Sequence, residues 1–514
     1  MKKHVSLLQV SSTLRYRYLW LVLAVLLSLF ATNGRWDLPL AAWLAPLFLL
    51  RFTRTSNLLL GYGGALLTSI VSMTFFLYQS QMLESPIIIV AAIIIGIILS
   101  IPYLLDRLIT SRLSPVNALL ATLAFPLGKV LSEYLVTLLL PFGSVLSLAY
   151  TQHDNVPLLQ LLAITGTYGI SFLMAWFASV GNFIWERDFS WSRVRTIAVF
   201  YSCVLILVLL GGSVRLTFFA PSATTIRVAG ISPAFSVRKT EWRKIIQIMQ
   251  KEQLSDTDFS ALHSSIAAIN EPLLLQSQRE AQAGAKIVVW PESAAATLAE
   301  EEAGLLERGK ALAKQEGMYL EIGYVVLHYQ HSLQITQNRT ALFDPQGRVN
   351  WIYDKAHPIP GMEDYVPGDG KVPVVETSYG TIASVICFDA DFPDLMRQGR
   401  SKGVDIMLVP SNDWRGIDPW QTYNTTFRAI ENGYSLVRQT SNGLSMTVDY
   451  QGRVLAATDY FTTEHQTMIA SVPSQGGQTI YAIVGDVFAW LCMAALCFLV
   501  GLVIFTTYQR HLRH

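Results

Sequence analysis

The segment PIIIVAAIIIGIILSIPYLL, residues 86–105, is a continuous apolar run without a charged side chain. A helix that crosses a bilayer needs about 20 predominantly apolar residues, so this segment predicts a membrane-spanning helix. Further apolar runs lie on both sides of it, at residues 18–33, 37–50, 57–78, 116–140, 156–184, 196–219 and 482–508. The sequence therefore predicts a polytopic α-helical membrane domain with about eight spans.

The composition also indicates a membrane as a partner. Apolar residues make up 52% of the 514 residues and charged residues 15%, whereas an ordinary soluble domain carries about 25% charged residues. Lys and Arg number 38, Asp and Glu number 37, and the net charge is +1. Binding of nucleic acid needs a basic face that neutralises phosphates, so this balance argues against a nucleic-acid partner.

Basic residues are distributed unevenly between the loops that join the predicted spans. One set of alternate loops, together with the two termini, carries most of them: Lys2, Lys3, Arg15, Arg17, Arg51, Arg54, Arg107, Arg112, Arg187, Arg193, Arg195, Arg510 and Arg513. The short loops on the opposite side of the membrane carry only Arg35 and Arg215. The positive-inside rule places the richer set, and with it both termini, in the cytoplasm. Residues 220–481 are then expected on the extracytoplasmic side.

Residues 220–481 form the polar part of the chain and read as an α/β domain. Short β-branched runs such as TIRVAGI, residues 225–231, alternate with helical stretches such as residues 260–284. This alternation predicts a layered α/β sandwich of about 250 residues. The predicted domains are a membrane domain with about seven spans at 1–219, the α/β domain at 220–481, and a last span with a short cytoplasmic tail at 482–514.

Three predicted strands of this domain lead to a polar side chain. KIVVWPES leads to Glu292, GRVNWIYDK to Lys355 and TIASVIC to Cys387. Ligands of α/β proteins bind beyond the carboxyl ends of strands, so these side chains can converge. Each residue also has a structural alternative, namely a helix cap for Glu292, a solvated loop lysine for Lys355 and core packing for Cys387.

The three residue types together fit acyl transfer. A thiol needs a base or a positive field to act as a nucleophile. Glu292 could take the thiol proton, and Lys355 could lower the thiol pKa and stabilise an oxyanion.

The remaining motifs favour neither a metal nor a cofactor. The other cysteines, Cys203, Cys492 and Cys497, lie in apolar runs. The isolated Cys387 cannot form an internal disulfide or a multi-thiolate zinc site. The polar part of the chain contains no GxGxxG motif after a strand, no GxxxxGK[ST] motif and no HExxH motif.

The motifs WPES, YDKAH and ICFD, which contain Glu292, Lys355 and Cys387 in this order, resemble the nitrilase superfamily. The succession of membrane helices, polar domain and last helix is similar to the apolipoprotein N-acyltransferase family over nearly the whole chain. Supporting matches are PFGSVLSLAYTQ, TGTYGISFL, SNDW, FRAIENG and TSNG.

This resemblance implies a nitrilase-like αββα sandwich and a two-step acyl transfer. Cys387 would attack an ester of a membrane phospholipid, and the N-terminal amine of a diacylglyceryl-cysteine apolipoprotein would then attack the resulting thioester. Glu292 would be the general base and acid, Lys355 would stabilise the oxyanion, and Glu363 would support the site. The implied chemistry needs no metal and no cofactor. The implied location is a bacterial cytoplasmic (inner) membrane.

Several aromatic side chains are candidate lipid contacts, although an aromatic residue in an α/β domain more often belongs to the core. The candidates for substrate binding are Trp242, Trp414, Trp420 and Phe388. In the membrane domain, Lys129 and Glu133 lie one helical turn apart and predict a mutually neutralising pair that locks helix packing. The alternative is that Glu133 lines a route for lipid head groups or a docking face for the polar domain.

The chain departs from the family pattern near the predicted nucleophile. Phe388 and Asp389 follow Cys387, where the family usually shows Tyr and Glu. The segment from Lys355 to Cys387 is short, whereas family members commonly carry a longer apolar lid there. Two alternatives stay open: a membrane-tethered amidase or acyltransferase acting on another amine, and a non-catalytic membrane binding protein.

Overall fold

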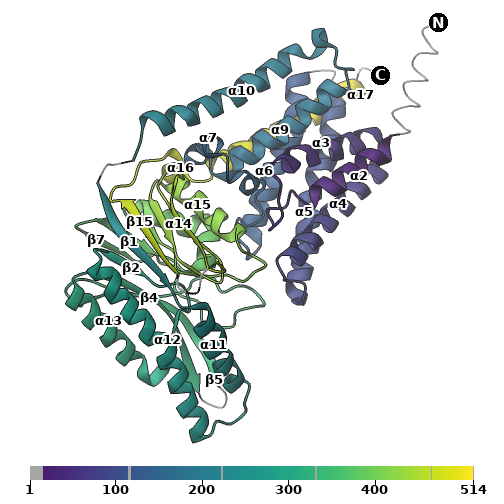
Figure 1. Ribbon diagram of the computed structural model, residues 1–514. Helices are drawn as coiled ribbons and strands as arrows, with labels where there is room; N and C mark the ends of the chain where they lie inside the picture. The colour runs from purple at the N-terminus through teal and green to yellow at the C-terminus, as the bar shows by residue number, and fades with distance from the viewer. Residues whose placement is uncertain are drawn as a thin grey trace. The chain divides into compact units, whose positions relative to one another are not determined.

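The computed structural model describes residues 16–113, 117–221, 224–329, 333–462, 464 and 466–512. The chain forms two compact units, Met1–Phe218 together with Val484–His514, and Phe219–Ile483. The first unit is helical and the second is α/β (Figure 1). Of the basic residues that predict the topology, Lys2, Lys3, Arg15 and Arg513 lie outside the described residues.

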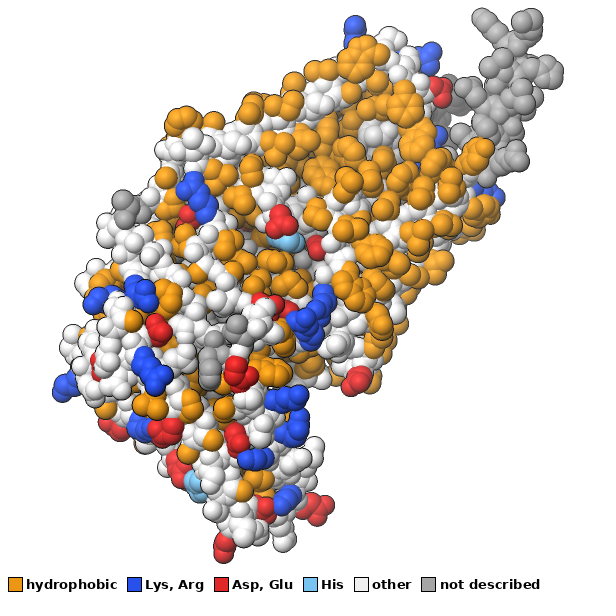
Figure 2. Space-filling view, viewed as in Figure 1, with side chains coloured by type: hydrophobic (Ala, Val, Ile, Leu, Met, Phe, Trp, Pro, Cys, Tyr) orange, Lys and Arg blue, Asp and Glu red, His pale blue; other side chains and the backbone are white. Residues whose placement is uncertain are grey.

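In the helical unit, six of the described helices are long and apolar enough to cross a membrane. They are α4 (Leu58–Gln79), α5 (Pro86–Leu113), α6 (Ala118–Leu139), α9 (Thr167–Trp185), α10 (Trp191–Phe218) and α17 (Val487–Leu512). Exposed apolar side chains cover much of this unit in Figure 2, whereas the α/β unit shows more Lys, Arg, Asp and Glu. A polytopic helical membrane domain, as predicted from the sequence, is therefore confirmed.

The predicted run of eight spans differs from the structure in three places. The described part of the first span, α2 (Arg17–Ser28), has 12 residues, and at 1.5 Å per residue it is shorter than the roughly 30 Å of a bilayer core. The second, α3 (Pro39–Thr55), has 17 residues. The predicted span 156–184 is wrong as one helix, because Gly166 adopts a φ of 62° and interrupts it. The pieces are α7 (Val156–Leu159), α8 (Leu162–Thr165) and α9.

The predicted pair of Lys129 and Glu133 is present on α6, with Nζ and Oε1 3.2 Å apart. The same Glu133 carboxylate accepts hydrogen bonds from Ser171 Oγ at 2.7 Å and from the backbone N–H of Leu148 at 3.2 Å. Leu148 begins η1 (Leu148–Gln152). Glu133 therefore joins α6 to α9 and to the loop between them, which is a packing role.

The α/β unit contains two large sheets and a small one. The seven-stranded sheet has the order β15-β1-β2-β4-β5-β6, with β3 paired to β4. Its strands are β1 (Thr225–Ser232), β2 (Ile287–Val289), β3 (Ala295–Leu298), β4 (Tyr319–Tyr329), β5 (Leu333–Phe343), β6 (Val349–Asp354) and β15 (Gln466–Pro473). The strand β2 is parallel to β1 and β4, and β6 returns antiparallel to β5.

The six-stranded sheet has the order β14-β13-β11-β9-β8-β7, and β8, β9 and β11 are parallel neighbours. Its strands are β7 (Val374–Thr377), β8 (Gly380–Ser384), β9 (Ile406–Leu408), β11 (Ser435–Arg438), β13 (Leu444–Val448) and β14 (Val454–Asp459). The short strands β10 (Ser411–Asn412) and β12 (Thr440–Ser441) pair with each other.

The two large sheets pack face to face and helices cover their outer faces (Figure 1). Apolar side chains of both sheets, such as Val289 and Ile406, share the core between them. The helices of this unit are α11 (Phe235–Met249), α12 (Asp256–Gln282), η2 (Ala299–Glu301), α13 (Glu302–Glu316), η3 (Cys387–Asp391), α14 (Pro393–Ser401), α15 (Trp420–Asn432) and α16 (Ile480–Val484). Leu273 and Leu305 pack on the first sheet, and Leu395 and Ala429 on the second. The predicted αββα sandwich is confirmed.

Candidate active site

Glu292 lies just beyond the carboxyl end of β2. The backbone N–H of Trp290 still bonds to the carbonyl oxygen of Glu321 at 2.9 Å, and the chain then turns away at Pro291. The carboxylate of Glu292 is buried. Its Oε1 accepts hydrogen bonds from Asn338 Nδ2 at 2.7 Å and from Lys355 Nζ at 2.8 Å. This one oxygen therefore joins the segment after β2 to the middle of β5 and to the residue that follows β6.

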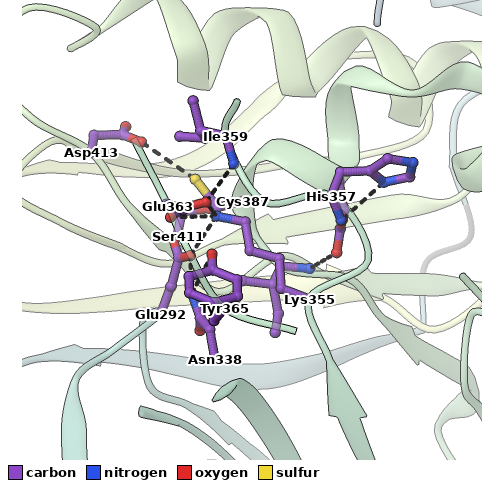
Figure 3. A network of polar contacts seen from close by, with 12 residues as sticks. Glu292, Asn338, Lys355, His357, Ile359, Glu363, Tyr365, Cys387, Ser411 and Asp413 are labelled. Carbon is purple, nitrogen blue, oxygen red and sulfur yellow. Dashed lines mark hydrogen bonds and ion pairs between the residues drawn. The ribbon is translucent and has the colours of Figure 1, made fainter. Parts of the chain in front are cut away.

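Lys355 directly follows β6, and its ammonium group lies between two carboxylates (Figure 3). Nζ is 2.8 Å from Glu292 Oε1 and 2.9 Å from both carboxylate oxygens of Glu363. Burial disfavours the charged amine, but Glu292 and Glu363 outweigh burial and raise the Lys355 pKa well above its usual value. The lysine is therefore a fixed cation at neutral pH.

Glu363 is held in place by the loop that carries it. Its Oε2 accepts a hydrogen bond from the backbone N–H of Ile359 at 2.7 Å, and its own backbone N–H bonds to the Ile359 carbonyl oxygen at 3.0 Å. Tyr365, on the same loop, accepts a hydrogen bond from Asn338 Nδ2 at 3.1 Å. The loop after Lys355 thus folds back onto the middle of β5 and onto Lys355 itself.

Cys387 lies beyond β8, at the start of η3. The sequence predicts that the strand TIASVICF continues through this cysteine, but β8 ends at Ser384. The backbone N–H of Cys387 bonds to the carbonyl oxygen of Pro410 at 2.9 Å, and the residue adopts a φ of 46°. A positive φ is uncommon for a residue with a Cβ and is strained. The chain leaves the sheet at this turn, which directs the thiol toward polar side chains (Figure 3).

The thiol of Cys387 lies among charged groups of both signs. Burial raises its pKa, the carboxylate of Glu292 raises it further, and the cations of Lys355 and Arg438 lower it, with a net rise well above the usual value. Cys387 is therefore a neutral thiol at neutral pH. A base that takes the thiol proton during the reaction would be required for it to act as a nucleophile.

Asp413 and Arg438 form a buried ion pair next to this thiol. Arg438 Nη2 is 2.7 Å from Asp413 Oδ1, which lies 4.0 Å from Cys387 Sγ. Burial raises the pKa of Asp413 to about 6, although Arg438 opposes the rise. Arg438 ends β11, and Asp413 and Cys387 lie beyond the neighbouring parallel strands β9 and β8. These three side chains therefore meet at one edge of the second sheet.

Asp389 connects the turn that carries Cys387 to the segment that carries Lys355. Its buried carboxylate accepts hydrogen bonds from Tyr353 OH and from the backbone N–H groups of Ala356, His357 and Ile386, at 2.9, 3.3, 2.8 and 3.1 Å. Asp389, which stands where a glutamate is usual, therefore accepts several hydrogen bonds with both carboxylate oxygens.

A cavity of about 910 Å³ opens next to these residues within the α/β unit. Its lining includes Ser293, Asn338, Glu363 and Tyr365. Asn338 and Glu363 bond to the Glu292–Lys355 pair, so the cavity extends to the immediate neighbours of that pair.

Of the predicted lipid contacts, Trp242 also lines this cavity. The described residues lining this cavity do not include Trp414, Trp420 or Phe388. Trp420 is buried with Nε1 bonded to the Gly416 carbonyl oxygen at 3.2 Å, and Phe388 packs edge-on against Phe392. The substrate-binding role of these three residues stays a prediction.

Sequence reasoning missed Asn338, Tyr365, Asp413 and Arg438. Asn338 begins an N-x-T match, a pattern that is frequent by chance, and Asp413 lies in the motif SNDW. Arg438 follows two apolar residues of a predicted strand in the segment LVRQT. A charged residue in such a strand could have indicated a functional position. No group of three or more His, Cys, Asp or Glu side chains in the described ranges has an arrangement that could hold a metal ion.

Two parts of the chain match models of known protein families. Residues 245–481 match the family model described as carbon-nitrogen hydrolase. Residues 14–180 match the model described as apolipoprotein N-acyltransferase N-terminal domain. The fold and these matches define a membrane protein with an enzyme domain of the carbon-nitrogen hydrolase superfamily.

Individual relatives identify the family. An apolipoprotein N-acyltransferase from Geobacter metallireducens is 30% identical over 397 residues, 72% of each chain. One from Rickettsia bellii is 25% identical over 59% of this chain and 60% of its own length. This chain belongs to the apolipoprotein N-acyltransferase family, as its motifs predict. Among solved structures, an amidase from Nesterenkonia sp. is 17% identical with a TM-score of 0.39, and the match covers 52% of this chain and 97% of that one.

Proposed function

We propose that this protein transfers a fatty acyl chain from a membrane phospholipid, through a thioester on Cys387, to the N-terminal amine of a diacylglyceryl-cysteine apolipoprotein. The observation that carries the proposal is the convergence of Glu292, Lys355 and Cys387 in a chain of this family. Buried side chains of a general base, a fixed cation and a thiol supply the groups that acyl transfer needs.

In the first half-reaction, Glu292 takes the proton of the Cys387 thiol, and the sulfur attacks the ester carbonyl carbon of the donor. The Lys355 ammonium stabilises the oxyanion that forms. When this intermediate collapses, the carbon–oxygen ester bond breaks and the lysophospholipid leaves with the proton held by Glu292. The enzyme then carries the acyl group as a thioester.

In the second half-reaction, the free amine of the lipoprotein attacks the thioester carbonyl carbon while Glu292 accepts an amine proton. The oxyanion again forms beside Lys355. Collapse breaks the carbon–sulfur bond, and Glu292 returns the proton to the Cys387 sulfur. An amide bond has replaced the ester bond, and no redox partner is involved.

A location in a bacterial cytoplasmic membrane suits both substrates, because each carries acyl chains. Each methylene group moved from lipid into water costs about 0.8 kcal/mol, so a site that works at the bilayer avoids extracting a whole chain. The loop charges support an arrangement with both termini in the cytoplasm and residues 220–481 outside it.

The test is conversion of a synthetic diacylated lipopeptide by the purified full-length protein in phospholipid micelles, followed by mass spectrometry. We expect the peptide to gain one acyl chain at its α-amine with the wild type but not with Glu292→Gln or Cys387→Ala. An α-N-acetylated lipopeptide is the matched control and should stay unchanged. Release of free fatty acid without a lipopeptide product would instead favour hydrolysis.

A further inference from the structure

Three cationic side chains of α11 line the cavity described above. They are Arg238, Lys239 and Arg243. Side chains three or four positions apart share one side of a helix. Arg238 and Trp242, and likewise Lys239 and Arg243, are four positions apart, so these residues form a single wall of the cavity. Arg238 Nη1 lies 3.2 Å from the carbonyl oxygen of Ser293, the residue after Glu292. This wall therefore begins next to the proposed catalytic base.

The positive charges on this wall are not neutralised by neighbouring carboxylates. Within the described ranges, Arg238, Lys239 and Arg243 form no ion pair with a carboxylate, whereas Lys244 on the same helix pairs with Glu241 at 2.9 Å. Of the acidic residues lining the cavity, Glu363 is engaged by Lys355, and Asp364 is exposed on the loop. Arg238 also contacts the Trp242 ring and Lys239 the Phe235 ring, but neither contact neutralises a positive charge. Cations that line a cavity and have no carboxylate partner among the described residues are suited to an anionic ligand.

The rest of the cavity lining combines apolar and polar side chains. Phe235, Trp242, Ile246, Val325 and Met362 contribute to it. Cationic and apolar groups lining one cavity match an amphiphile in which a negative charge lies close to hydrocarbon. A glycerophospholipid has this form, since its phosphate is only a few covalent bonds from each ester carbonyl.

We propose that Arg238, Lys239 and Arg243 bind the phosphodiester of the glycerophospholipid acyl donor and so position its ester near Cys387. This inference rests on the proposed function. The diacylglyceryl group of the acceptor carries no phosphate, so the subsite acts in the donor half-reaction alone. Charge-assisted contacts to a phosphate are among the stronger hydrogen bonds in proteins.

The kinetic test measures the rate at which purified full-length protein gains an acyl mass on Cys387. Donors are phosphatidylglycerol and a neutral 4-nitrophenyl ester with the same acyl chain. We expect Lys239→Gln/Arg243→Gln to react about tenfold more slowly with phosphatidylglycerol and at the wild-type rate with the neutral ester. Lys244→Gln is the matched control, because it removes one exposed charge of α11 that does not line the cavity. Equal slowing with both donors, or no slowing, would overturn the subsite.

A binding test keeps the subsite separate from the proposed chemistry. A short-chain diether phosphatidylglycerol contains no cleavable ester, and its affinity is measured by calorimetry beside that of the phosphate-free diether glycerol. We expect Lys239→Gln/Arg243→Gln to weaken binding of the phosphate-containing lipid about tenfold and to leave the other unchanged. If no acyl adduct forms in the wild type but this difference appears, the proposed function fails and the subsite stands. Equal affinities in wild type and variant would reject the subsite.

Discussion

The environment of Cys387 describes a thiol that reacts only when a base assists it. Burial and the Glu292 carboxylate raise its pKa, while Lys355 and Arg438 act in the opposite direction. A permanently ionised thiolate would be open to alkylation and oxidation at neutral pH. A buried neutral thiol next to a carboxylate instead becomes nucleophilic only when that carboxylate takes its proton. The thiol is thereby protected until a lipid donor is bound.

These opposing charges predict the pH dependence of Cys387 alkylation. Since Glu292 raises the thiol pKa, Glu292→Gln should shift the pH profile of iodoacetamide labelling to lower pH. Since Lys355 lowers it, Lys355→Met should shift the profile to higher pH. Labelling rates are measured by intact mass from pH 6 to 10, with Cys387→Ala as the blank. Shifts of the same sign in both variants would contradict this electrostatic account.

At the residue scale, the sequence identified the three side chains of the proposed chemistry but not their partners. Glu292, Lys355 and Cys387 stand out because each follows a recognisable apolar strand. Asn338 and Arg438, which bond to side chains of the site, lie within strands. The pairing of strands that are distant in sequence decides which side chains these two residues contact. Pairing and register between strands cannot be read from one sequence, because they depend on the whole sheet.

Among the elements, the η3 turn decides where the thiol lies. The sequence pattern indicates a strand through residue 388, since the run from Thr381 is apolar and β-branched. The structure ends β8 four residues earlier because backbone and side-chain bonds outside the sheet compete for this segment. One of these bonds runs from the backbone N–H of Ile386 to the Asp389 carboxylate at 3.1 Å. Local propensity is overridden by tertiary hydrogen bonds here.

Replacement of Asp389 by the family's usual glutamate tests this connection. The added methylene would displace the carboxylate from four donors that it now meets at 2.8 to 3.3 Å. We expect Asp389→Glu to lower kcat about tenfold and the free energy of unfolding by about 1–3 kcal/mol, with KM for phospholipid little changed. Activity and stability are measured together on the purified protein. A fully active Asp389→Glu would show that η3 tolerates either acid.

The strand β4 carries a buried carboxylate away from the cavity. Burial raises the pKa of Glu321 to about 8, and the nearby polar side chains of Ser384, Thr340 and Trp351 offset this only in part. No hydrogen bond of standard geometry from the described residues reaches its oxygens. Glu321 is therefore protonated in the folded state at neutral pH, whereas it ionises near its usual value of 4.5 once the chain unfolds.

This difference predicts how stability depends on pH. The folded state holds a proton that the unfolded state has lost, so Glu321 makes the protein less stable as pH rises from about 4.5 to about 8. Glu321→Gln should match the wild type near pH 5 and be more stable near pH 8.5, by an amount on the order of a few kcal/mol. Thermal unfolding in detergent across this pH range provides the measurement. A constant difference at every pH would refute the buried protonated carboxyl.

At the scale of the whole molecule, hydropathy predicted the class of the chain better than the number of its spans. Runs with few interruptions, such as α5, are found as helices. The run 156–184 is predominantly apolar and contains no charged residue. Gly166 nevertheless breaks the helix, and a hydropathy average over the run does not detect such a break. The αββα layers follow from the alternation of strands and helices. The helix α11 was not predicted, because its apolar residues are interspersed with four basic ones, Arg238, Lys239, Arg243 and Lys244.

The proposed topology predicts which side of the membrane is accessible. Glu252 and Arg193 are both exposed, one in the α/β unit and the other on α10. In intact spheroplasts, we expect Glu252→Cys to react with a membrane-impermeant maleimide and Arg193→Cys to react only after the membrane is permeabilised. The unsubstituted protein is the control for Cys203, Cys387, Cys492 and Cys497. The opposite labelling pattern would invert the topology.

In the proposed reaction Cys387 carries the acyl group between the two substrates. Intact-mass spectrometry of the full-length protein, incubated with phospholipid and no acceptor, tests this directly. We predict that the wild type gains the mass of one acyl chain, that hydroxylamine or a diacylated lipopeptide removes it, and that Cys387→Ala gains nothing. An acyl adduct of equal yield on Cys387→Ala, or a wild type that acylates the lipopeptide without any trappable adduct on Cys387, would contradict this reaction.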